Sequence, residues 1–403
     1  MPVLPIDTGR YGTPEMLKIF EEQARVQRLL DVEAALALAH AEVGDISKKD
    51  AEKIRVMAST RYVKVERVKA IEKEIKHDIA ALVRALAEVC GSSGTYVHLG
   101  ATSYDIVDTA NALQLKAATE IIEKKLVTLK SILQRQAAKY KATVMIGRTH
   151  GQHALPITLG FKFAVWGYEV SRHIERLNNC RHRLVAGKVS GAVGTQASLG
   201  EHAARIQELV MKRLGISAAE ISTQIVQRDR YAEFVSLLAI IASSLENFAT
   251  EIRELQRPEI GELSESFERD HQVGSSTMPH KRNPETCERV CGLTRIVRSL
   301  TIPALENIVT WHERDLSSPH WVPTTTTLGN TLSSFSQTRY IKSYRLPKAK
   351  RKMPGRVPAS FNCGPGREPS PAVCPTRGLP KGIRGAYLEC QNPNCPAIPV
   401  SSA

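Results

Sequence analysis

The sequence predicts an all-α protein built as an elongated bundle of long helices, and three observations support this. Between Phe234 and Leu255, apolar residues recur at alternating spacings of four and three, the pattern of a coiled-coil-like seam. Similarly long patterns span residues 106–140 and 158–184. Strand-like alternation is rare, and neither of the common glycine-rich nucleotide-binding motifs occurs. Because rods of this length leave apolar surface that a small globule cannot bury, we expect them to associate, also between subunits.

The expected helices follow one another along most of the chain. In chain order they span residues 14–43, 51–57, 63–89, 106–140, 158–184 and 234–255. Pro258 ends the last of these. A further helix is predicted to begin at Pro284, because Asn283 is able to accept the first free amides and proline presets φ. The start of a helix carries partial positive charge, so with Lys281 and Arg282 beside it this end suits an anionic substrate.

The composition separates a body from a tail. The 403 residues, 42% of them hydrophobic, suffice for two or three domains. The first residues lack the pattern of a signal peptide, and no apolar run approaches the roughly 20 residues of a membrane helix, so we expect a cytoplasmic protein. From Pro319 onward the chain holds 13 of its 21 prolines, and 12 Lys or Arg against two acids. Most of the net charge of +14 therefore lies in the tail, which argues against nucleic-acid binding by the body.

We accordingly expect three regions. These are an N-terminal helical domain over 1–100, a central long-helix bundle over 101–317, and an irregular tail rich in Pro, Cys and basic residues over 318–403. Cys287 and Cys291 lie four residues apart on the last expected helix. Without a second pair they indicate reduced thiols rather than a metal site.

Four polar clusters are able to carry chemistry. Residues 274–284 read Gly-Ser-Ser-Thr-Met-Pro-His-Lys-Arg-Asn-Pro, a serine loop that we expect to be mobile and that leads into a helix start. Residues 76–78 read Lys-His-Asp within a helical pattern, and residues 100–105 read Gly-Ala-Thr-Ser-Tyr-Asp before a long helix. Residues 147–153 read Gly-Arg-Thr-His-Gly-Gln-His before another. Each is weak evidence alone, since a lone histidine is usually structural and a Thr-Ser pair is usually a helix cap.

Together the clusters resemble the fumarase/aspartase superfamily and, within it, the adenylosuccinate lyase family. The resemblance runs from about Arg10 to Ser317, and the serine loop is similar to the family's signature segment. His280 selects the subfamily, because relatives of fumarase and aspartase usually have Gly or Ala there and argininosuccinate lyases usually have Gln. Thr102-Ser103 and Gly147-Arg148-Thr149-His150-Gly151 are similar to two other characteristic regions of the superfamily. The segments that resemble the adenylosuccinate lyase family are Arg10-Tyr11, Lys76-His77-Asp78, Thr223-Gln224, Gln227-Arg228-Asp229-Arg230 and His312-Glu313-Arg314-Asp315.

Three alternatives stay open at this point. Carboxymuconate cycloisomerases can share the sequence of the serine loop, but they generally lack the Thr-His-Gly arrangement around His150. An inactive or structural protein that retains the lyase scaffold predicts substrate binding without fumarate release. A nucleic-acid binder that uses the basic tail predicts salt-sensitive binding that disappears when the residues after Ser317 are removed.

The resemblance implies an activity and a set of site residues. The activity is β-elimination of fumarate from adenylosuccinate to give AMP, and from the succinylaminoimidazole carboxamide ribonucleotide of purine biosynthesis, without metal or organic cofactor. His150 is implied as the acid and Ser275 as the base. Since a serine hydroxyl is a weak base, Ser275 has to react as an alkoxide, stabilised when the loop closes over substrate. The implied substrate contacts are Arg10, Tyr11, Lys76, His77, Asp78, Thr102, Ser103, Gln224, Ser276, Lys281, Asn283 and Arg314. The resemblance also implies a homotetramer with active sites shared between subunits.

The chain departs from the family pattern after Ser317. The family continues there with a Ser-Ser-x-x-Arg segment and a last bundle helix, whereas here Ser318 is followed by Pro-His-Trp-Val-Pro and no arginine. We hypothesise that the tail derives from a shifted reading frame, so that the last bundle helix is missing and apolar seams are exposed. Resequencing the coding DNA tests this, and an uninterrupted frame with no family-like continuation in another frame would contradict it.

Overall fold

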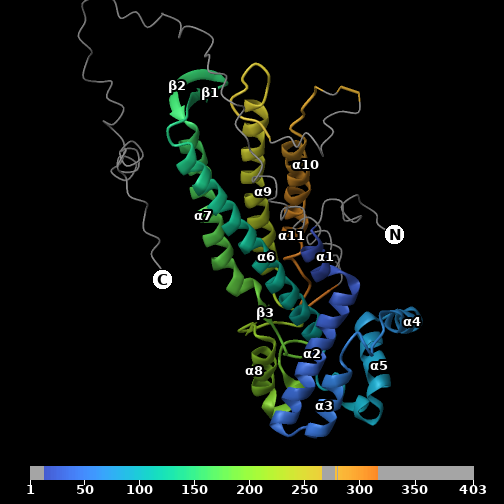
Figure 1. Cartoon of the computed structure of the whole chain (residues 1–403). Helices are drawn as coiled ribbons and strands as arrows, with labels where there is room; N and C mark the ends of the chain where they lie inside the picture. Colours follow the sequence, from blue (N-terminus) through green and yellow to red (C-terminus); the bar gives the residue numbers. More distant parts are fainter. Residues whose placement is uncertain (1–12, 266–276, 279, 316–403) are drawn as a thin grey trace, which may run out of the picture.

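A computed structural model describes residues 13–265, 277–278 and 280–315 of the chain (Figure 1). Its helices and strands are α1 (Pro14–Phe20), α2 (Glu22–Val43), α3 (Lys48–Met57), α4 (Val65–Ile75), α5 (Asp78–Cys90), α6 (Ser103–Lys139), β1 (Val144–Thr149), β2 (Gln152–Thr158), α7 (Leu159–Leu184), β3 (Ala186–Gly187), α8 (Ala203–Leu214), β4 (Ser217–Ala218), α9 (Asp229–Leu255), α10 (Glu285–Ser299) and α11 (Thr301–Glu306). The expected all-α bundle of long helices is confirmed. The tail over 318–403 lies outside the described residues.

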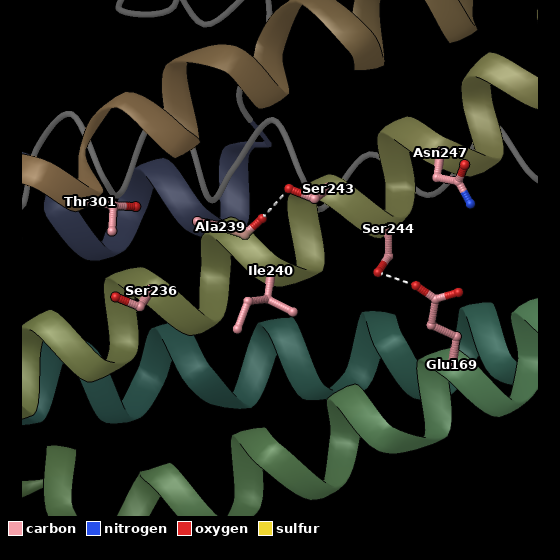
Figure 2. A pocket seen from close by; sticks show the side chains of 8 residues that line it. All are labelled: Glu169, Ser236, Ala239, Ile240, Ser243, Ser244, Asn247 and Thr301. Carbon is pink, nitrogen blue, oxygen red and sulfur yellow. Dashed lines mark hydrogen bonds between the residues drawn. The ribbon is translucent and has the colours of Figure 1, made fainter.

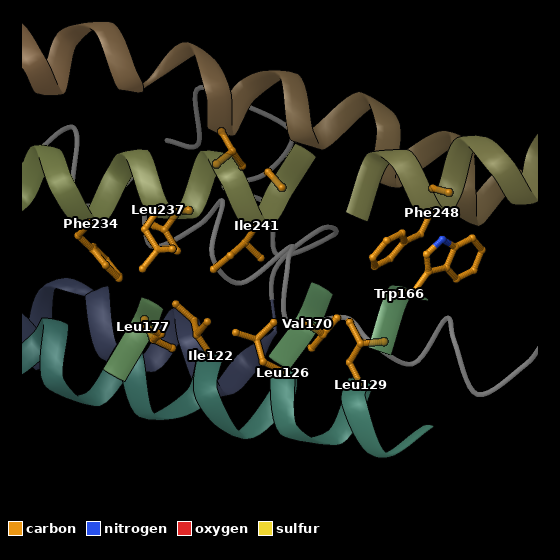
Figure 3. Packing of buried hydrophobic residues seen from close by; sticks show 14 of the residues in the cluster. Ile122, Leu126, Leu129, Trp166, Val170, Leu177, Phe234, Leu237, Ile241 and Phe248 are labelled. Atoms are coloured by element: carbon orange, nitrogen blue, oxygen red, sulfur yellow. The ribbon is translucent and has the colours of Figure 1, made fainter. Parts of the chain in front are cut away.

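The long helices α6, α7, α9 and α10 run side by side and form the elongated part of the molecule (Figure 1). The predicted seam of α9 faces inward, where Phe234, Ile241 and Phe248 are buried against α6 and α7 (Figure 3). Trp166 of α7 stacks on Phe248, with ring centroids 4.8 Å apart. Interdigitated aromatic and aliphatic side chains at this spacing are the packing that a coiled-coil-like seam predicts.

Helix α9 corrects one expectation about membranes. Among the described helices it is long and apolar enough to cross a membrane by length and composition, although the sequence was expected to hold no such run. More than half of its apolar window is buried, and its apolar side chains pack against α6, α7 and α10. A buried helix of a soluble bundle meets the same criterion, so the observation is weak evidence for a membrane span.

A second apolar core lies at the other end of the bundle. It is formed by α2, α3, α4, α5 and α8 together with the first turns of α6 (Figure 1). Helix α6 thus belongs to both cores, with Ile106 and Leu113 in the second and Leu115 and Leu133 in the first. The core of the N-terminal helices therefore extends beyond residue 100, and the boundaries of the three regions stay predictions.

The helix expected over 63–89 is interrupted, which corrects the placement of Lys76-His77-Asp78. Lys76 adopts a left-handed conformation (φ 57°) and ends α4. The Nδ1 atom of His77 accepts a hydrogen bond from the amide of Ala80 at 3.3 Å and so caps α5. The three residues therefore form a turn between two helices, because a residue with positive φ does not continue a right-handed helix. The helix expected over 14–43 is likewise broken, at Glu21.

The structure also contains a β-hairpin that the sequence patterns did not predict. Strands β1 and β2 pair antiparallel from Val144 opposite Thr158 to Thr149 opposite Gln152, with an irregularity between Ile146 and Arg148. The two turn residues, His150 and Gly151, both have positive φ, 54° and 74°. This is the backbone of a tight two-residue hairpin turn, in which the first residue is usually Asn, Asp or Gly. A histidine there gives no recognisable hairpin signal in the sequence.

Candidate active site

Four residues that were predicted to contact the substrate gather where α6 begins: Thr102, Ser103, Gln224 and Arg314. The N–H group of Thr102 donates a hydrogen bond to the Asp105 carboxylate at 2.9 Å and so helps to cap the helix. The same carboxylate is completely buried and pairs with the equally buried ammonium group of Lys188. The backbone N–H groups of Ser190 and Gly191 also donate to it. Buried charges are tolerated only when they are satisfied in this way, so the start of α6 is held rigidly.

Two arginines and an aromatic ring lie beside this helix start. The guanidinium group of Arg314 donates to Gln224 Oε1 at 3.0 Å and lies 3.9 Å from the centre of the Tyr104 ring. Arg228 lies 5.7 Å from the same ring and donates to the buried carboxylate of Asp108 at 3.0 Å. Cationic and aromatic groups so placed suit a planar, anionic ligand such as a nucleotide. We call the following residues the α6-start cluster: Thr102, Ser103, Tyr104, Asp105, Asp108, Lys188, Gln224, Arg228 and Arg314.

A further buried ion pair supports the loop that leads into α6. His98 has a positive φ of 66°, and its Nδ1 atom lies 2.6 Å from a carboxylate oxygen of the buried Glu33. Burial alone lowers the pKa of His98, but the charge and hydrogen bond of Glu33 outweigh it and raise the pKa. The protonated form of His98 is therefore favoured in the folded protein. The ion pair of His98 with Glu33 was not predicted from the sequence.

The Lys76-His77-Asp78 turn is exposed at one side of the molecule (Figure 1). Asp78 lies 3.7 Å from Arg25 of α2, and the Lys76 ammonium group donates to the carbonyl of Lys73. Their predicted role as substrate contacts stays a prediction.

The predicted acid lies at the opposite end of the bundle. His150 is exposed at the tip of the β1–β2 hairpin, which follows the last turn of α6 (Figure 1). Next to it in sequence, Arg148 makes two hydrogen bonds to Glu262, both of 2.9 Å. Glu262 lies in the segment that follows α9, so this pair ties the hairpin to the bundle. The Glu262 hydrogen bond raises the pKa of Arg148, which stays charged.

Helix α10 begins at the same end, and a carboxylate that the sequence did not indicate caps its start. Glu265 accepts the amide of Cys287 at 2.6 Å and that of Thr286 at 3.3 Å. The partial positive charge of this helix start is thus already matched by a carboxylate. Lys281 is exposed and Asn283 is half-buried just before it. Arg10, Tyr11, Ser275 and Ser276 lie outside the described residues, so the base and three contact residues stay predictions.

Apart from the Lys76-His77-Asp78 turn, the described site residues therefore fall into two groups at the two ends of α6. With 37 residues at 1.5 Å each, α6 is about 55 Å long. Thr102 and Ser103 stand at its beginning, whereas the hairpin with His150 follows its end. No substrate of nucleotide size reaches both groups of one chain.

A groove lies along α9 between the two ends (Figure 2). It measures about 540 Å³ and is lined by Glu169, Ser236, Ala239, Ile240, Ser243, Ser244, Asn247 and Thr301. The Ser244 hydroxyl donates to Glu169 and lies 2.8 Å from His173 Nε2. Burial and the nearby Arg176 lower the pKa of His173 to about 4, so this histidine is neutral. None of the lining residues was predicted to bind substrate.

Comparison with known proteins identifies the family. A family model described as lyase matches residues 9–298. The chain is 58% identical over 318 residues to the adenylosuccinate lyase of Pyrococcus horikoshii, which covers 79% of this chain and 70% of that protein. It is 54% identical over 319 residues to the adenylosuccinate lyase of Methanocaldococcus jannaschii, which covers 79% of this chain and 69% of that protein.

A solved structure gives the more distant comparison. The 3-carboxy-cis,cis-muconate lactonizing enzyme of Pseudomonas putida superposes with a TM-score of 0.77 at 33% identity, covering 84% of this chain and 76% of that one. The identity to the lyases is much higher, which favours the lyase over the cycloisomerase alternative. The chain therefore belongs to the adenylosuccinate lyase family, a family of carbon–nitrogen lyases within the fumarase/aspartase superfamily.

Proposed function

We propose that this protein eliminates fumarate from adenylosuccinate, giving AMP, and from the succinylaminoimidazole carboxamide ribonucleotide. In this reaction a base removes a proton from the carbon beside a carboxylate, and an acid protonates the nitrogen as the carbon–nitrogen bond breaks. His150 acts as the acid and Ser275 as the base. Their roles rest on the matched motifs, and the exposed position of His150 at a hairpin tip supports the proposal because such a ring is free to reach a substrate.

The α6-start cluster binds the nucleotide part of the substrate in this proposal. Arg314 and Gln224 are already hydrogen-bonded to each other, and the Tyr104 ring lies against Arg314. A guanidinium group offers two parallel donors to a phosphate or carboxylate. Lys281 and Asn283, at the other end of the bundle, hold the succinyl carboxylates. The elimination needs no metal or organic cofactor, and the reaction takes place in the cytoplasm.

The observation that carries the proposal for assembly is the separation of the two groups by the length of α6. A complete site requires the α6-start cluster of one copy beside the β1–β2 hairpin of another, so we infer a homo-oligomer. The family resemblance favours a homotetramer. The apolar surface supports this inference. Phe161, Val165 and Tyr168 share one face of α7, and Tyr168 is 68% exposed. Exposed apolar faces of this kind mark association surfaces.

We expect a helix of a second copy to pack into the groove on α9. Ser236, Ala239 and Ser243 are small and allow a close approach, while Ile240 is 48% exposed at their centre. Ala239→Trp fills the groove and should shift the mass measured by light scattering toward the monomer. Val56→Trp, at an exposed apolar residue of α3, is the matched control. An unchanged mass for Ala239→Trp would contradict the placement of this interface.

The activity is tested by measuring fumarate release from adenylosuccinate. We expect release by the wild-type protein and a loss of at least 100-fold in kcat for both His150→Ala and Ser275→Ala, in line with the usual contribution of a general acid or base. His153→Ala, an exposed histidine of the same hairpin, serves as the control and should retain activity. If the wild type is active and either substitution leaves the rate unchanged, the assignment of that residue is wrong.

A further inference from the structure

We propose that Glu262 is a positioning residue for the elimination, acting through Arg148 on the hairpin that carries His150. This inference rests on the proposed role of His150 as the acid. Glu262 lies in the segment that follows α9, more than 100 residues from His150 along the chain. It therefore links two parts of the site that the sequence separates.

The contact has the geometry of a specific link. Two parallel N–H groups of Arg148 donate to the two carboxylate oxygens of Glu262, each at 2.9 Å. Only 18% and 22% of the two side chains are exposed. The guanidinium group also donates to the carbonyl of Ile146 at 3.2 Å, which braces the irregular stretch of β1. Bidentate, largely desolvated pairs fix orientation more firmly than exposed single contacts.

The hairpin depends on this contact because little else holds its outer half. Met145 is buried in the main core and anchors the base of the hairpin. Beyond it, the side chains from Thr149 to Pro156 are exposed. In the part of the chain that the structure describes, the Arg148–Glu262 pair is the side-chain hydrogen bond that links this outer half to the rest of the molecule. Without it, the position of His150 is set by the two strands alone.

Glu262 also belongs to the segment that arranges the start of α10. The amide of Glu262 donates to the carbonyl of Leu255, and that of Glu265 donates to Gln256 Oε1 at 2.9 Å. The Gln256 side-chain amide donates in turn to the carbonyl of Arg282 at 3.1 Å. One short segment thus holds both the hairpin and the residues beside Lys281. Glu262 is placed to fix the hairpin relative to the proposed carboxylate-binding residues of the same end.

The test removes the charge of Glu262 with little change of shape. Glu262→Gln should lower kcat about 10- to 100-fold and change KM little. A reacting group that is misplaced by about 1 Å slows the chemical step by a factor of this size. The substitution should also accelerate hydrogen exchange of the amides of residues 144–158. Glu233→Gln removes a bidentate but more exposed pair with Arg183 between α7 and α9, and should leave both measurements unchanged.

The charge-swapped double variant, Arg148→Glu with Glu262→Arg, keeps the test decisive if the single variant is unstable. It should recover part of the kcat that each single substitution loses. The proposal is overturned if Glu262→Gln keeps kcat within twofold of the wild type, if hairpin exchange does not change, or if the double variant is no better than the singles. Faster hairpin exchange is measurable even in a protein without lyase activity, so failure of this inference and failure of the proposed function give different results.

Discussion

The two ends of α6 present two kinds of site architecture. At its start, charges are buried and fully paired, as in Asp105 with Lys188 and Asp108 with Arg228. At its end, His150 is exposed at the tip of a hairpin. One partly exposed ion pair, Arg148 with Glu262, links this hairpin to the bundle. In the proposed function, the first end binds the substrate and the second supplies the reactive group. The difference teaches that the binding half is built from buried ion pairs, whereas the proposed acid lies on an exposed hairpin.

The largest expected effect concerns the buried pair at the start of α6. Lys188→Met leaves the Asp105 carboxylate buried without its ammonium partner, and we expect a loss of about 3–5 kcal/mol in the free energy of unfolding. Urea unfolding measures this. Lys69→Met breaks an exposed pair with Glu22 and should cost at most about 1 kcal/mol. Equal losses in the two variants would show that the start of α6 is not held by buried charge.

An intermediate effect is expected at the base of the hairpin. A Cβ atom at Gly160 would lie 2.4 Å from the carbonyl of Ala137 and 2.7 Å from the backbone of Lys141. Gly160→Ala should therefore destabilise the protein by about 1–3 kcal/mol, as overpacking does, and accelerate exchange in the hairpin. Gly292→Ala, in α10, meets no atom within 4 Å and should be neutral or stabilising in thermal unfolding. A stable Gly160→Ala protein would contradict the tight junction of α6 and α7.

The smallest effect is a dependence on pH at the start of α6. Because Glu33 raises the pKa of His98 in the folded state, the pair stabilises the protein fully below the unfolded pKa of about 6.5. This contribution is lost as the pH rises through the higher folded pKa. Urea unfolding of wild type and His98→Gln should thus differ more at pH 6 than at pH 9. A difference that grows with pH would reverse the proposed sign.

The sequence predicted the helices well and the three-dimensional contacts poorly, for physical reasons. The seam from Phe234 to Leu255 was visible because a periodic apolar face repeats locally. The partner of Asp105 was not, since Lys188 lies 83 residues away and a lone lysine carries no pattern. No local pattern indicated Glu262 or Glu265 either, because their partners Arg148 and Cys287 lie 114 and 22 residues away.

The motifs named candidate site residues but did not predict how far apart these residues lie. Thr102, Ser103, Gln224 and Arg314 were each proposed as contacts, and the structure brings these four together at one helix start. His150 was proposed in the same set, but α6 holds it at the far end. The length of a predicted helix was the available signal, because 35 residues between two motifs already place them far apart.

The central claim, that each site combines the α6-start cluster of one copy with the hairpin of another, is tested most directly by mixing two inactive variants. His150→Ala and Arg314→Ala are each expected to release no measurable fumarate. When they are unfolded together and refolded as mixed oligomers, about a quarter of the sites should draw an intact half from each of two copies, and activity should return to about that fraction of the wild type. If mixed oligomers form and activity does not return, the two halves belong to one chain and the account is wrong.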